Sequence, residues 1–261
     1  MAQAWRLLLD GPIDGELNMA VDRAVQCAHA AGAAPPTLRL YSWARPTVTL
    51  GRFQDVSMLD AAYCREQGID VVRRFTGGRG VLHDHELTYG LIAGVAQGVP
   101  RGVAKSYVHL CQALVRSFEV LGVPASITST DSPSHASGAC YLQTTRADVA
   151  VNGGKLSGSA QVWLHDTVLQ HGSFVLSRDI DRESRVFLLG ADETRELASA
   201  ETLTGALGRT PALDEVVSAV CAGFESALGI NLSVGTLNME ELRLVGELLP
   251  ATVVRQPSEQ A

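Results

Sequence analysis

Lysine is nearly absent from this chain. Of its 21 basic residues only Lys105 and Lys155 are lysines, so arginine fills nearly every position where either residue would serve. A lysine inside a block that looks like a binding site is therefore difficult to explain as an ordinary solvent-exposed charge. The formal net charge of -7 argues against non-specific binding to nucleic acid, although a local patch of arginines can still dock an acidic protein.

Long apolar runs are missing as well. No segment is long enough to span a bilayer, and residues 1–6 lack the charged-then-apolar order of a signal peptide. We therefore expect a cytoplasmic protein without a membrane partner. The 261 residues, 46% of them hydrophobic, can bury a sizeable core, and no linker or repeat divides them. These features predict a single α+β domain over residues 1–250 and a frayed tail over residues 251–261.

The five cysteines are odd in number and form no C-x-x-C pair, which is typical of reduced thiols rather than of a disulfide framework or a zinc knuckle. Cys140 follows the small residues Ser137-Gly138-Ala139, which would leave its thiol accessible to a substrate. From these residues alone, a structural thiol and a reactive thiol both remain open. The other four cysteines lie in helix-like stretches and are expected to be structural: Cys27, Cys64, Cys111 and Cys221.

Familiar catalytic signatures are also lacking. The chain has no Walker A sequence, G-x-G-x-x-G, G-x-S-x-G or H-E-x-x-H. Phosphate-loop nucleotide hydrolysis, a Rossmann cofactor and a serine hydrolase therefore lose support. His83 and His85 would share one face of a strand, but a metal would need a third ligand such as His171. We expect no metal, no cofactor and a hydrogen-bonding role for His83. His171 alone fits a core histidine equally well.

The most informative segment that is present spans residues 73–84, which follow an apolar strand predicted at 69–72. Its three glycines allow positive φ and a close approach of the backbone to a ligand, and its three arginines and amides then face something anionic or carbonyl-rich. A tight glycine turn with solvated arginines is the alternative. A second block, Gly154-Lys155-Leu156-Ser157-Gly158-Ser159-Ala160-Gln161, favours a binding site.

Apolar spacing gives a coarse secondary structure. Asn152-Gly153 is a strong two-residue hairpin signal, after which Lys155 opens the returning strand. The segment 126–138, rich in Ser, Thr, Asp and Pro, is expected to be mobile. Helices are predicted at 17–31, 58–67, 103–121, 210–228 and 239–249, strands at 69–72, 87–95, 147–151 and 168–176, and extended chain at 37–50.

The chain resembles the biotin/lipoate ligase and lipoyl/octanoyl transferase superfamily, and within it the octanoyltransferases of the LipM type. The resemblance runs from about Trp5 to the last helix. It implies a mixed β-sheet flanked by helices, akin to biotin protein ligase and class II aminoacyl-tRNA synthetases, with a catalytic core at about 32–230. It is carried by Leu17-Asn18-Met19-Ala20-Val21-Asp22, Pro36-Thr37-Leu38-Arg39-Leu40-Tyr41-Ser42-Trp43, Gly51-Arg52-Phe53-Gln54, the segment 73–84, the Gly154 block and Gln170-His171-Gly172.

Two chemistries occur in this superfamily. Ligases activate free lipoate with ATP, whereas transferases take octanoyl from acyl carrier protein, in many cases on a cysteine. LipM-type transferases place this cysteine fifteen residues before the motif lysine, which is the relation of Cys140 to Lys155. Lipoate-salvage ligases usually lack that cysteine, read Gly-Gly-Gly-Ala where this chain has Gly77-Gly78-Arg79-Gly80, and often carry a further C-terminal domain. Tyr141-Leu142-Gln143-Thr144-Thr145 matches the family only loosely.

The resemblance implies an octanoyl-[acyl-carrier-protein]:protein N-octanoyltransferase of lipoate biosynthesis, with Cys140 and Lys155 as catalytic residues. Octanoyl-acyl carrier protein is the implied donor, and a lipoyl domain such as the glycine cleavage H protein is the implied acceptor. The alternatives are an ATP-dependent lipoate-protein ligase and a non-catalytic module that binds a lipoyl or acyl-carrier domain. The implied substrate-binding residues are Arg74, Thr76, Gly77, Gly78, Arg79, Gly80, His83, Ser157, Gly158, Ser159, Ala160 and His171.

The two implied catalytic residues predict a mechanism. A free thiol has a pKa of about 8.5 and is mostly protonated at neutral pH, so a nearby ammonium would make the nucleophile available. Lys155 is expected to supply that ammonium. Cys140 would attack the carrier thioester, and a lysine of the lipoyl domain would then attack octanoyl-Cys140 to form an amide.

Overall fold

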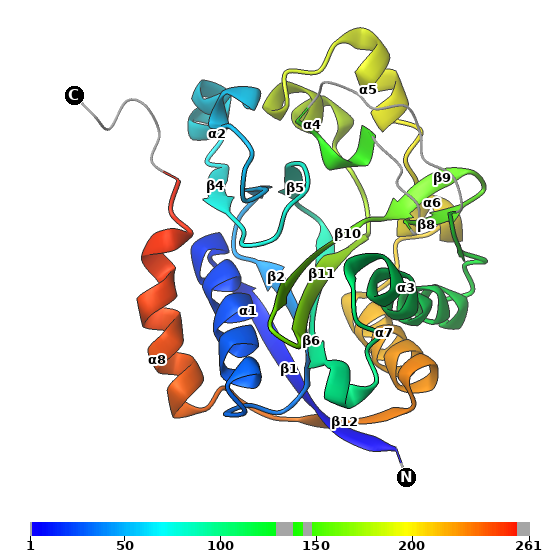
Figure 1. Ribbon diagram of the computed structural model, residues 1–261. Coiled ribbons are helices and arrows are strands. Elements are labelled where there is room, and N and C mark those ends of the chain that lie inside the picture. Colours follow the sequence, from blue (N-terminus) through cyan, green and yellow to red (C-terminus); the bar gives the residue numbers. More distant parts are fainter. Residues whose placement is uncertain (1, 129–137, 143–147, 255–261) are drawn as a thin grey trace.

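The computed structural model describes residues 2–128, 138–142 and 148–254. Its centre is a six-stranded sheet built from β1 (Gln3–Ile13), β2 (Thr37–Trp43), β6 (Glu86–Gly94), β10 (Ser159–Leu164), β11 (Thr167–Val175) and β12 (Ile230–Val234). The strand order is β10-β11-β6-β2-β1-β12 (Figure 1). β1 runs parallel to β2 and β12, whereas β2, β6, β11 and β10 are antiparallel neighbours, so the predicted mixed sheet is confirmed.

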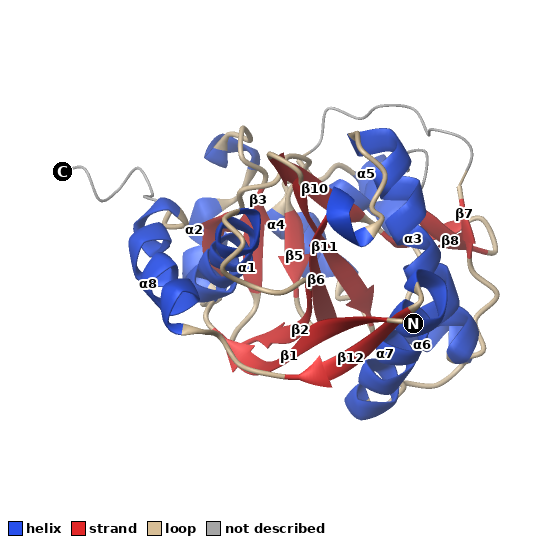
Figure 2. Cartoon of the chain, turned by 60° about the horizontal axis from the view of Figure 1, so that its bottom comes forward, coloured by secondary structure: helices blue, strands red, loops and turns tan. Residues whose placement is uncertain are grey.

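Long helices cover both faces of this sheet: α1 (Gly15–Ala30), α3 (Val103–Val120), α7 (Leu213–Leu228) and α8 (Met239–Leu248). α1 packs beside α8 on one face, and α3 packs beside α7 on the other (Figures 1 and 2). Successive strand residues point to opposite faces. Leu7 and Leu91 therefore belong to the core under α3 and α7, while their neighbours Leu8 and Ile92 belong to the core under α1 and α8.

Two three-stranded sheets flank the central one. The first has the order β4-β3-β5 and the second the order β7-β8-β9, and a bridge from Gly80 to Ala139 connects the chain after β4 with the chain before β8. Their strands are β3 (Thr47–Leu50), β4 (Asp70–Arg73), β5 (Val81–His83), β7 (Ser126–Ile127), β8 (Val149–Val151) and β9 (Gly154–Ser157). The remaining elements are α2 (Ala61–Glu66), α4 (Ile180–Val186), α5 (Ala191–Leu197), α6 (Leu203–Leu207) and the 3₁₀ turns η1 (Val56–Met58), η2 (Val95–Gln97), η3 (Cys140–Leu142) and η4 (Leu249–Ala251).

Most of the predicted elements are confirmed. α1, α3, α7 and α8 lie close to their predicted bounds, and Gly229 ends α7 with φ of 64°. Asn152 and Gly153 have φ of 51° and 84° between β8 and β9, as a two-residue hairpin requires. The extended segment 37–50 is divided, because the chain turns after Trp43 and sends β2 and β3 into different sheets.

Two further predictions are corrected. The helix predicted at 58–67 is shorter: η1 ends at Met58 and α2 begins only at Ala61, where the Asp60 carboxylate caps it by accepting the N–H of Tyr63. The tail is not frayed from residue 251, since the Arg73 N–H donates to the Thr252 carbonyl at 2.9 Å and Val253 bridges Val72. The rest of that tail and most of the segment 126–138 lie outside the described residues.

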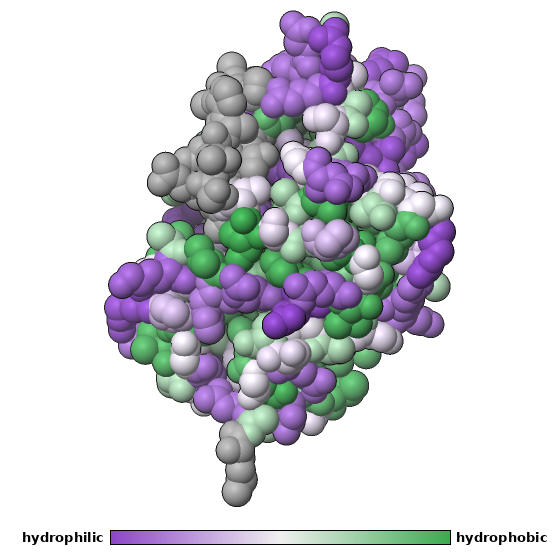
Figure 3. All heavy atoms as spheres, turned by 90° about the vertical axis from the view of Figure 1, so that its right-hand side faces the viewer, coloured by the Kyte–Doolittle hydropathy of each residue, from purple (hydrophilic) through white to green (hydrophobic). Residues whose placement is uncertain are grey.

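The surface over α3 and α7 is mixed in polarity. Hydrophobic and hydrophilic side chains are interspersed on this side of the molecule (Figure 3). The exposed apolar side chains of α3 are Val103, Val108 and Val120, and scattered side chains of this kind are ordinary on protein surfaces. Among the helices of the described residues, none is long and apolar enough to cross a membrane.

Candidate active site

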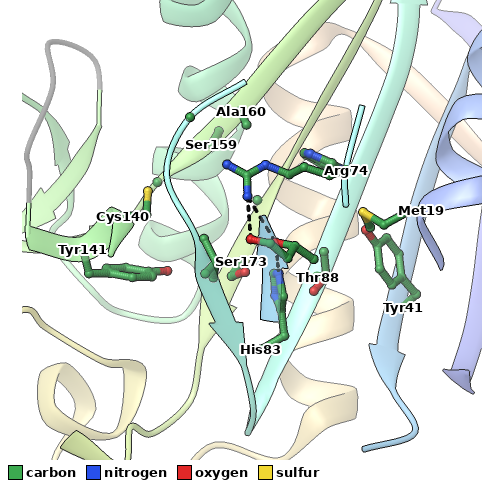
Figure 4. A pocket seen from close by; sticks show the side chains of 16 residues that line it. Met19, Tyr41, Arg74, His83, Thr88, Cys140, Tyr141, Ser159, Ala160 and Ser173 are labelled. Carbon is green, nitrogen blue, oxygen red and sulfur yellow. Dashed lines mark hydrogen bonds between the residues drawn. The ribbon is translucent and has the colours of Figure 1, made fainter. Parts of the chain in front are cut away.

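A narrow cavity of about 60 Å³ lies where the chain after β4, the turn at Cys140 and the central sheet meet. Cys140 and Tyr141 stand at one side of it, and Met19 and Tyr41 stand at the opposite side (Figure 4). We call residues 74–80, which follow β4, the glycine loop. Arg74 and Gly78 of this loop line the cavity together with Gly158 and the first two residues of β10, Ser159 and Ala160, so the two blocks singled out in the sequence come together here.

Cys140 is fixed to the glycine loop through the backbone. Its N–H donates to the carbonyl of Gly80 at 2.9 Å, and the N–H of Gly80 donates to the carbonyl of Gly138 at 2.8 Å. The side chain is half-buried and lines the cavity. The thiol is therefore held at the cavity wall, where a bound molecule can reach it.

Lys155 approaches Cys140 from behind the wall. Its Nζ lies 4.0 Å from the Cys140 Sγ, 3.3 Å from the Cys140 carbonyl and 2.9 Å from Oδ2 of Asp148. A Cβ at position 158 would stand 2.9 Å from the Lys155 Cε, so glycine at that position makes room for the lysine. The arrangement brings a buried cation within contact of a sulfur.

The charge on Lys155 is maintained despite its burial. Burial disfavours the ammonium, but the neighbouring Cys140 and Asp148 outweigh this effect and raise the pKa of Lys155 above its ordinary value. The side chain therefore remains an ammonium at neutral pH. In general, a positive charge beside a cysteine sulfur stabilises the thiolate, which is the nucleophilic form of cysteine.

Arg74 binds the glycine loop itself. Its Nη2 donates to the carbonyls of Gly77 and Arg79 at 2.8 and 2.7 Å, and its Nη1 donates to the Thr49 carbonyl at 2.9 Å. Burial lowers the pKa of Arg74 to about 10. Gly78 has φ of 94°, and a Cβ there would stand 2.9 Å from the Arg74 Nη2. The arginines of this segment were expected to face an anionic or carbonyl-rich ligand, whereas Arg74 donates to backbone carbonyls of the protein itself.

His171 stands between two buried side chains. Its Nδ1 lies 2.9 Å from Oδ2 of Asp22, and its Nε2 lies 2.8 Å from Oγ1 of Thr76. Burial lowers the pKa of His171 although Asp22 acts in the opposite direction, so the ring is neutral at neutral pH. The neutral ring donates from Nδ1 to the carboxylate and accepts the Thr76 hydroxyl at Nε2. His171 therefore connects α1 with the glycine loop.

His83 is hydrogen-bonded, as expected. Its Nδ1 lies 2.7 Å from Oε1 of Glu86, its Nε2 lies 2.9 Å from Oγ1 of Thr49, and its ring stacks on Trp43 at 4.1 Å between centroids. The shared strand face expected for His83 and His85 is wrong, because His85 has φ of 49° in the turn between β5 and β6. Within the described ranges, no group of three or more His, Cys, Asp or Glu side chains could hold a metal ion.

The expected site residues divide into two sets. Those that line the cavity are Cys140, Arg74, Gly78, His83, Gly158, Ser159, Ala160 and His171. Those that do not line it are Lys155, Thr76, Gly77, Arg79, Gly80 and Ser157. Ser157 supports the wall from outside the lining, because its hydroxyl donates to the carbonyl of the lining residue Ser173 at 2.8 Å.

Sequence reasoning missed several groups that complete the site. Asp148 is the carboxylate partner of Lys155, and Asp22 is the carboxylate partner of His171. Tyr141 lines the cavity and packs its ring against the Arg178 guanidinium at 3.8 Å. The one available signal was a carboxylate within an otherwise apolar pattern, which Asp22 shows in α1 and Asp148 shows before β8.

Comparisons with known proteins show what the chain is similar to. Residues 14–225 match the lipoyl protein ligase A/B catalytic domain. Octanoyltransferase LipM of Kyrpidia tusciae is 36% identical, with 95% of each chain covered, and that of Symbiobacterium thermophilum is 36% identical, with 96% of each chain covered. A solved structure of lipoate-protein ligase A bound with ATP superposes with a TM-score of 0.80 at 25% identity, covering 96% of this chain and 95% of the other. Protein Ta0514 of T. acidophilum, solved with bound lipoic acid, gives a TM-score of 0.79 at 24% identity, with 96% of each chain covered.

The two kinds of comparison support different statements. The solved structures confirm the predicted fold, a mixed sheet flanked by helices as in lipoate ligases. The family match covers most of the length of the chain, and the curated relatives are similar over nearly all of it. The chain therefore belongs to the lipoyl protein ligase A/B catalytic domain family.

Proposed function

We propose that this chain is an octanoyltransferase, an acyltransferase of lipoate biosynthesis that moves octanoyl from acyl carrier protein to a lysine of a lipoyl domain. The observation that carries the proposal is the 4.0 Å approach of the Lys155 Nζ to the Cys140 Sγ at the cavity wall. Relatives at 36% identity over nearly the whole chain bear the name octanoyltransferase LipM. The glycine cleavage H protein is the acceptor we propose, and the cytoplasm, where a catalytic thiol stays reduced, is the proposed compartment.

The first step loads Cys140. Its thiolate attacks the carbonyl carbon of the octanoyl-carrier thioester, the bond from that carbon to the carrier sulfur breaks, and the carrier leaves as a thiol with the proton that Cys140 gave up. One thioester replaces another, so the step needs no ATP. Lys155 stabilises the attacking thiolate through its positive charge.

The second step unloads Cys140. The neutral amine of the acceptor lysine attacks the carbonyl carbon of octanoyl-Cys140, a carbon–nitrogen bond forms, and the carbon–sulfur bond breaks. The amine nitrogen releases its surplus proton to solvent, and Cys140 returns as a thiolate beside the Lys155 ammonium. The amide product is more stable than the thioester, so the reaction runs toward transfer.

The cavity is the proposed place of the acyl chain. Met19, Val81 and the ring of Tyr41 contribute apolar wall, and Cys140 stands at one side. Each methylene that leaves water contributes about 0.8 kcal/mol. Donors with shorter acyl chains are therefore expected to react less efficiently, by roughly fourfold for each methylene removed.

Mass spectrometry of the intact protein tests the proposal. Incubation with octanoyl-acyl carrier protein is expected to add one octanoyl group, sensitive to hydroxylamine, which Cys140→Ala loses. Cys27→Ala, which removes another half-buried thiol, is the matched control and is expected to be acylated normally. Acylation of Cys140→Ala at the wild-type rate would end the covalent mechanism.

A second experiment distinguishes octanoyl transfer from ATP-dependent ligation. The lipoyl domain is incubated with the protein and free octanoate, with and without ATP. The chain would be an ATP-dependent ligase instead if free octanoate modified the lipoyl domain only in the presence of ATP and octanoyl-acyl carrier protein did not modify it.

A further inference from the structure

Most arginines of the described part of the chain are paired with carboxylates. Salt bridges hold Arg6, Arg39, Arg45, Arg101, Arg116, Arg178, Arg182, Arg195, Arg209 and Arg243. A chain of net charge -7 offers enough carboxylates for this. An arginine that stays out of such pairs is therefore an exception that calls for a reason.

Arg23, Arg52, Arg73 and Arg74 are exceptions that share one place. These four line a single groove of about 400 Å³ together with Phe75, and none of them forms a salt bridge to a carboxylate of the described residues. We call these five residues the arginine groove. It lies where α1, the end of β4 and η4 meet, on the side of the molecule where α8 lies (Figure 1).

The arginines of the groove are held by uncharged partners. The Arg73 Nη1 donates to the carbonyls of Gly51 and Gln54 at 2.9 and 2.8 Å, and the Arg23 Nη1 donates to Oε1 of Gln26 at 2.6 Å. Neutral acceptors position a guanidinium without cancelling its charge. Hydrogen bonds from Ser57 are the main cause of the lowered pKa of the exposed Asp55, and the charge of Arg73 adds a smaller contribution without a salt bridge between the two side chains. The groove therefore keeps a concentration of positive charge on an acidic protein.

The groove is joined to the active-site cavity. Arg74 lines both. Gly78, an exposed residue of the cavity wall, packs so closely on Gly51 that a Cβ at Gly51 would stand 1.9 Å from the Gly78 carbonyl oxygen. Gln54 donates from Nε2 to the Gly138 carbonyl at 2.9 Å, just before Cys140. The short segment 51–54 thus runs from the groove to the nucleophile.

Phe53 adds an apolar contact to the same segment. Its side chain is 87% exposed, the highest value among the large hydrophobic residues of the described chain. The Arg52 guanidinium lies 5.2 Å from its ring centre. An exposed aromatic side chain beside arginines is the composition that protein interfaces favour.

We propose that the arginine groove and Phe53 form the docking surface for an acidic face of the protein that carries the acyl donor. The inference rests on the proposed function. Charge complementarity identifies the occupant: the guanidinium groups of Arg23, Arg52 and Arg73, which form no salt bridges within the described residues, receive clustered Asp and Glu side chains, while Phe53 takes an apolar contact. The segment 51–54 places the docked protein next to Cys140, which is where its thioester must arrive.

Charge reversal at the groove tests the proposal. Arg52→Glu and Arg23→Glu are compared with Arg116→Glu, an exposed arginine of α3 that is remote from the groove. Acylation of Cys140 is measured with two donors, octanoyl-acyl carrier protein and octanoyl-pantetheine, which lacks the carrier protein. With the carrier donor, each groove reversal is expected to reduce kcat/KM about tenfold through KM and to weaken its salt dependence. Arg116→Glu is expected to have the wild-type kcat/KM with either donor. The groove variants are expected to have the wild-type kcat/KM with octanoyl-pantetheine.

Three results would overturn the proposal. Unchanged kinetics with the carrier donor would mean that the groove is not used, and equal losses with both donors would mean that the arginines support the cavity instead. Inhibition of the octanoyl-pantetheine reaction by inorganic phosphate that disappears in Arg52→Glu would assign the groove to small anions.

Binding separates failure of the docking surface from failure of the proposed function. Calorimetry with Cys140→Ala and octanoyl-acyl carrier protein measures association without chemistry. Adding Arg52→Glu to this variant is expected to weaken Kd about tenfold. If the wild type transfers no octanoyl, the function is wrong. If Kd is unaffected by Arg52→Glu, the docking surface is wrong, whatever the reaction proves to be.

Discussion

The carboxylate of Asp148 lies 2.9 Å from the ammonium of Lys155, with only 2% and 4% of the two side chains exposed. The hairpin at Asn152-Gly153 creates this pair, because it folds β9 back beside the chain that enters β8. The hydroxyl of Tyr107 donates to the second carboxylate oxygen at 3.3 Å. Lys155 is therefore fixed between Asp148 and Cys140, and its position depends on the carboxylate as much as on the sulfur.

Asp148→Asn is expected to destabilise the protein. The change keeps the shape of the side chain but leaves a buried ammonium with less compensation, so the pKa of Lys155 falls and the free energy of unfolding drops by about 3 kcal/mol. Urea denaturation measures the loss. Asp166→Asn breaks the exposed pair with Arg101 and is expected to cost less than about 1 kcal/mol. Equal effects of the two changes would contradict the importance of the buried pair.

Lys155→Ala is expected to slow alkylation of Cys140. Without the ammonium 4.0 Å from its sulfur, Cys140 loses a positive charge that favours a thiolate, and reaction with iodoacetamide near neutral pH should slow by roughly tenfold. Peptide mass spectrometry follows Cys140 separately from the other thiols. The matched control is Lys105→Ala, which removes the other lysine of the chain, an exposed one on α3. Identical pH profiles for wild type and Lys155→Ala would remove the proposed role of Lys155.

Local patterns predicted the parts of the fold that local forces determine. The 3.6-residue apolar spacing fixed α1 and α3 near their observed bounds, and Asn152-Gly153 predicted its hairpin from backbone preference alone. β1 and β12 were not predicted. The Leu7-Leu8-Leu9 run in β1 does not alternate in polarity, and β12 pairs in parallel with β1 from the other end of the sequence. Such a pairing leaves no local signal.

The active site, too, has one part that the sequence predicted and another part that only the folded chain shows. Cys140 and Lys155 are 15 residues apart in the sequence, in blocks that a reader of the sequence can recognise, and the structure places their side chains in contact. Asp22 and His171 are 149 residues apart in the sequence, so only the folded chain shows that they meet. The partner of Arg74 was equally hidden, because a carbonyl of the arginine's own loop has no side-chain signature.

Two glycines near the cavity are expected to differ sharply in how well they tolerate substitution by alanine. A Cβ at Gly51 would stand 1.9 Å from the Gly78 carbonyl oxygen, whereas one at Gly77 would meet nothing within 4 Å. Gly51→Ala should therefore displace the glycine loop and reduce the free energy of unfolding by about 1–3 kcal/mol. Gly77→Ala should leave stability within about 0.5 kcal/mol of the wild type. Thermal denaturation compares them, and a reversed order would show that Gly77 needs its freedom for a reason other than space.

His171 is expected to give the protein a characteristic loss of stability in weak acid. Burial holds its pKa below the ordinary 6.5, although Asp22 opposes this, while the nearby Arg74 and His83 act with burial. Between that lowered pKa and 6.5 the unfolded chain binds a proton that the folded chain does not, so the free energy of unfolding falls as the pH decreases through this window. His171→Gln removes the titrating group and should give a flatter curve there. Urea denaturation at a series of pH values measures the slopes, and parallel curves for wild type and His171→Gln would show that the ring is not held neutral by the fold.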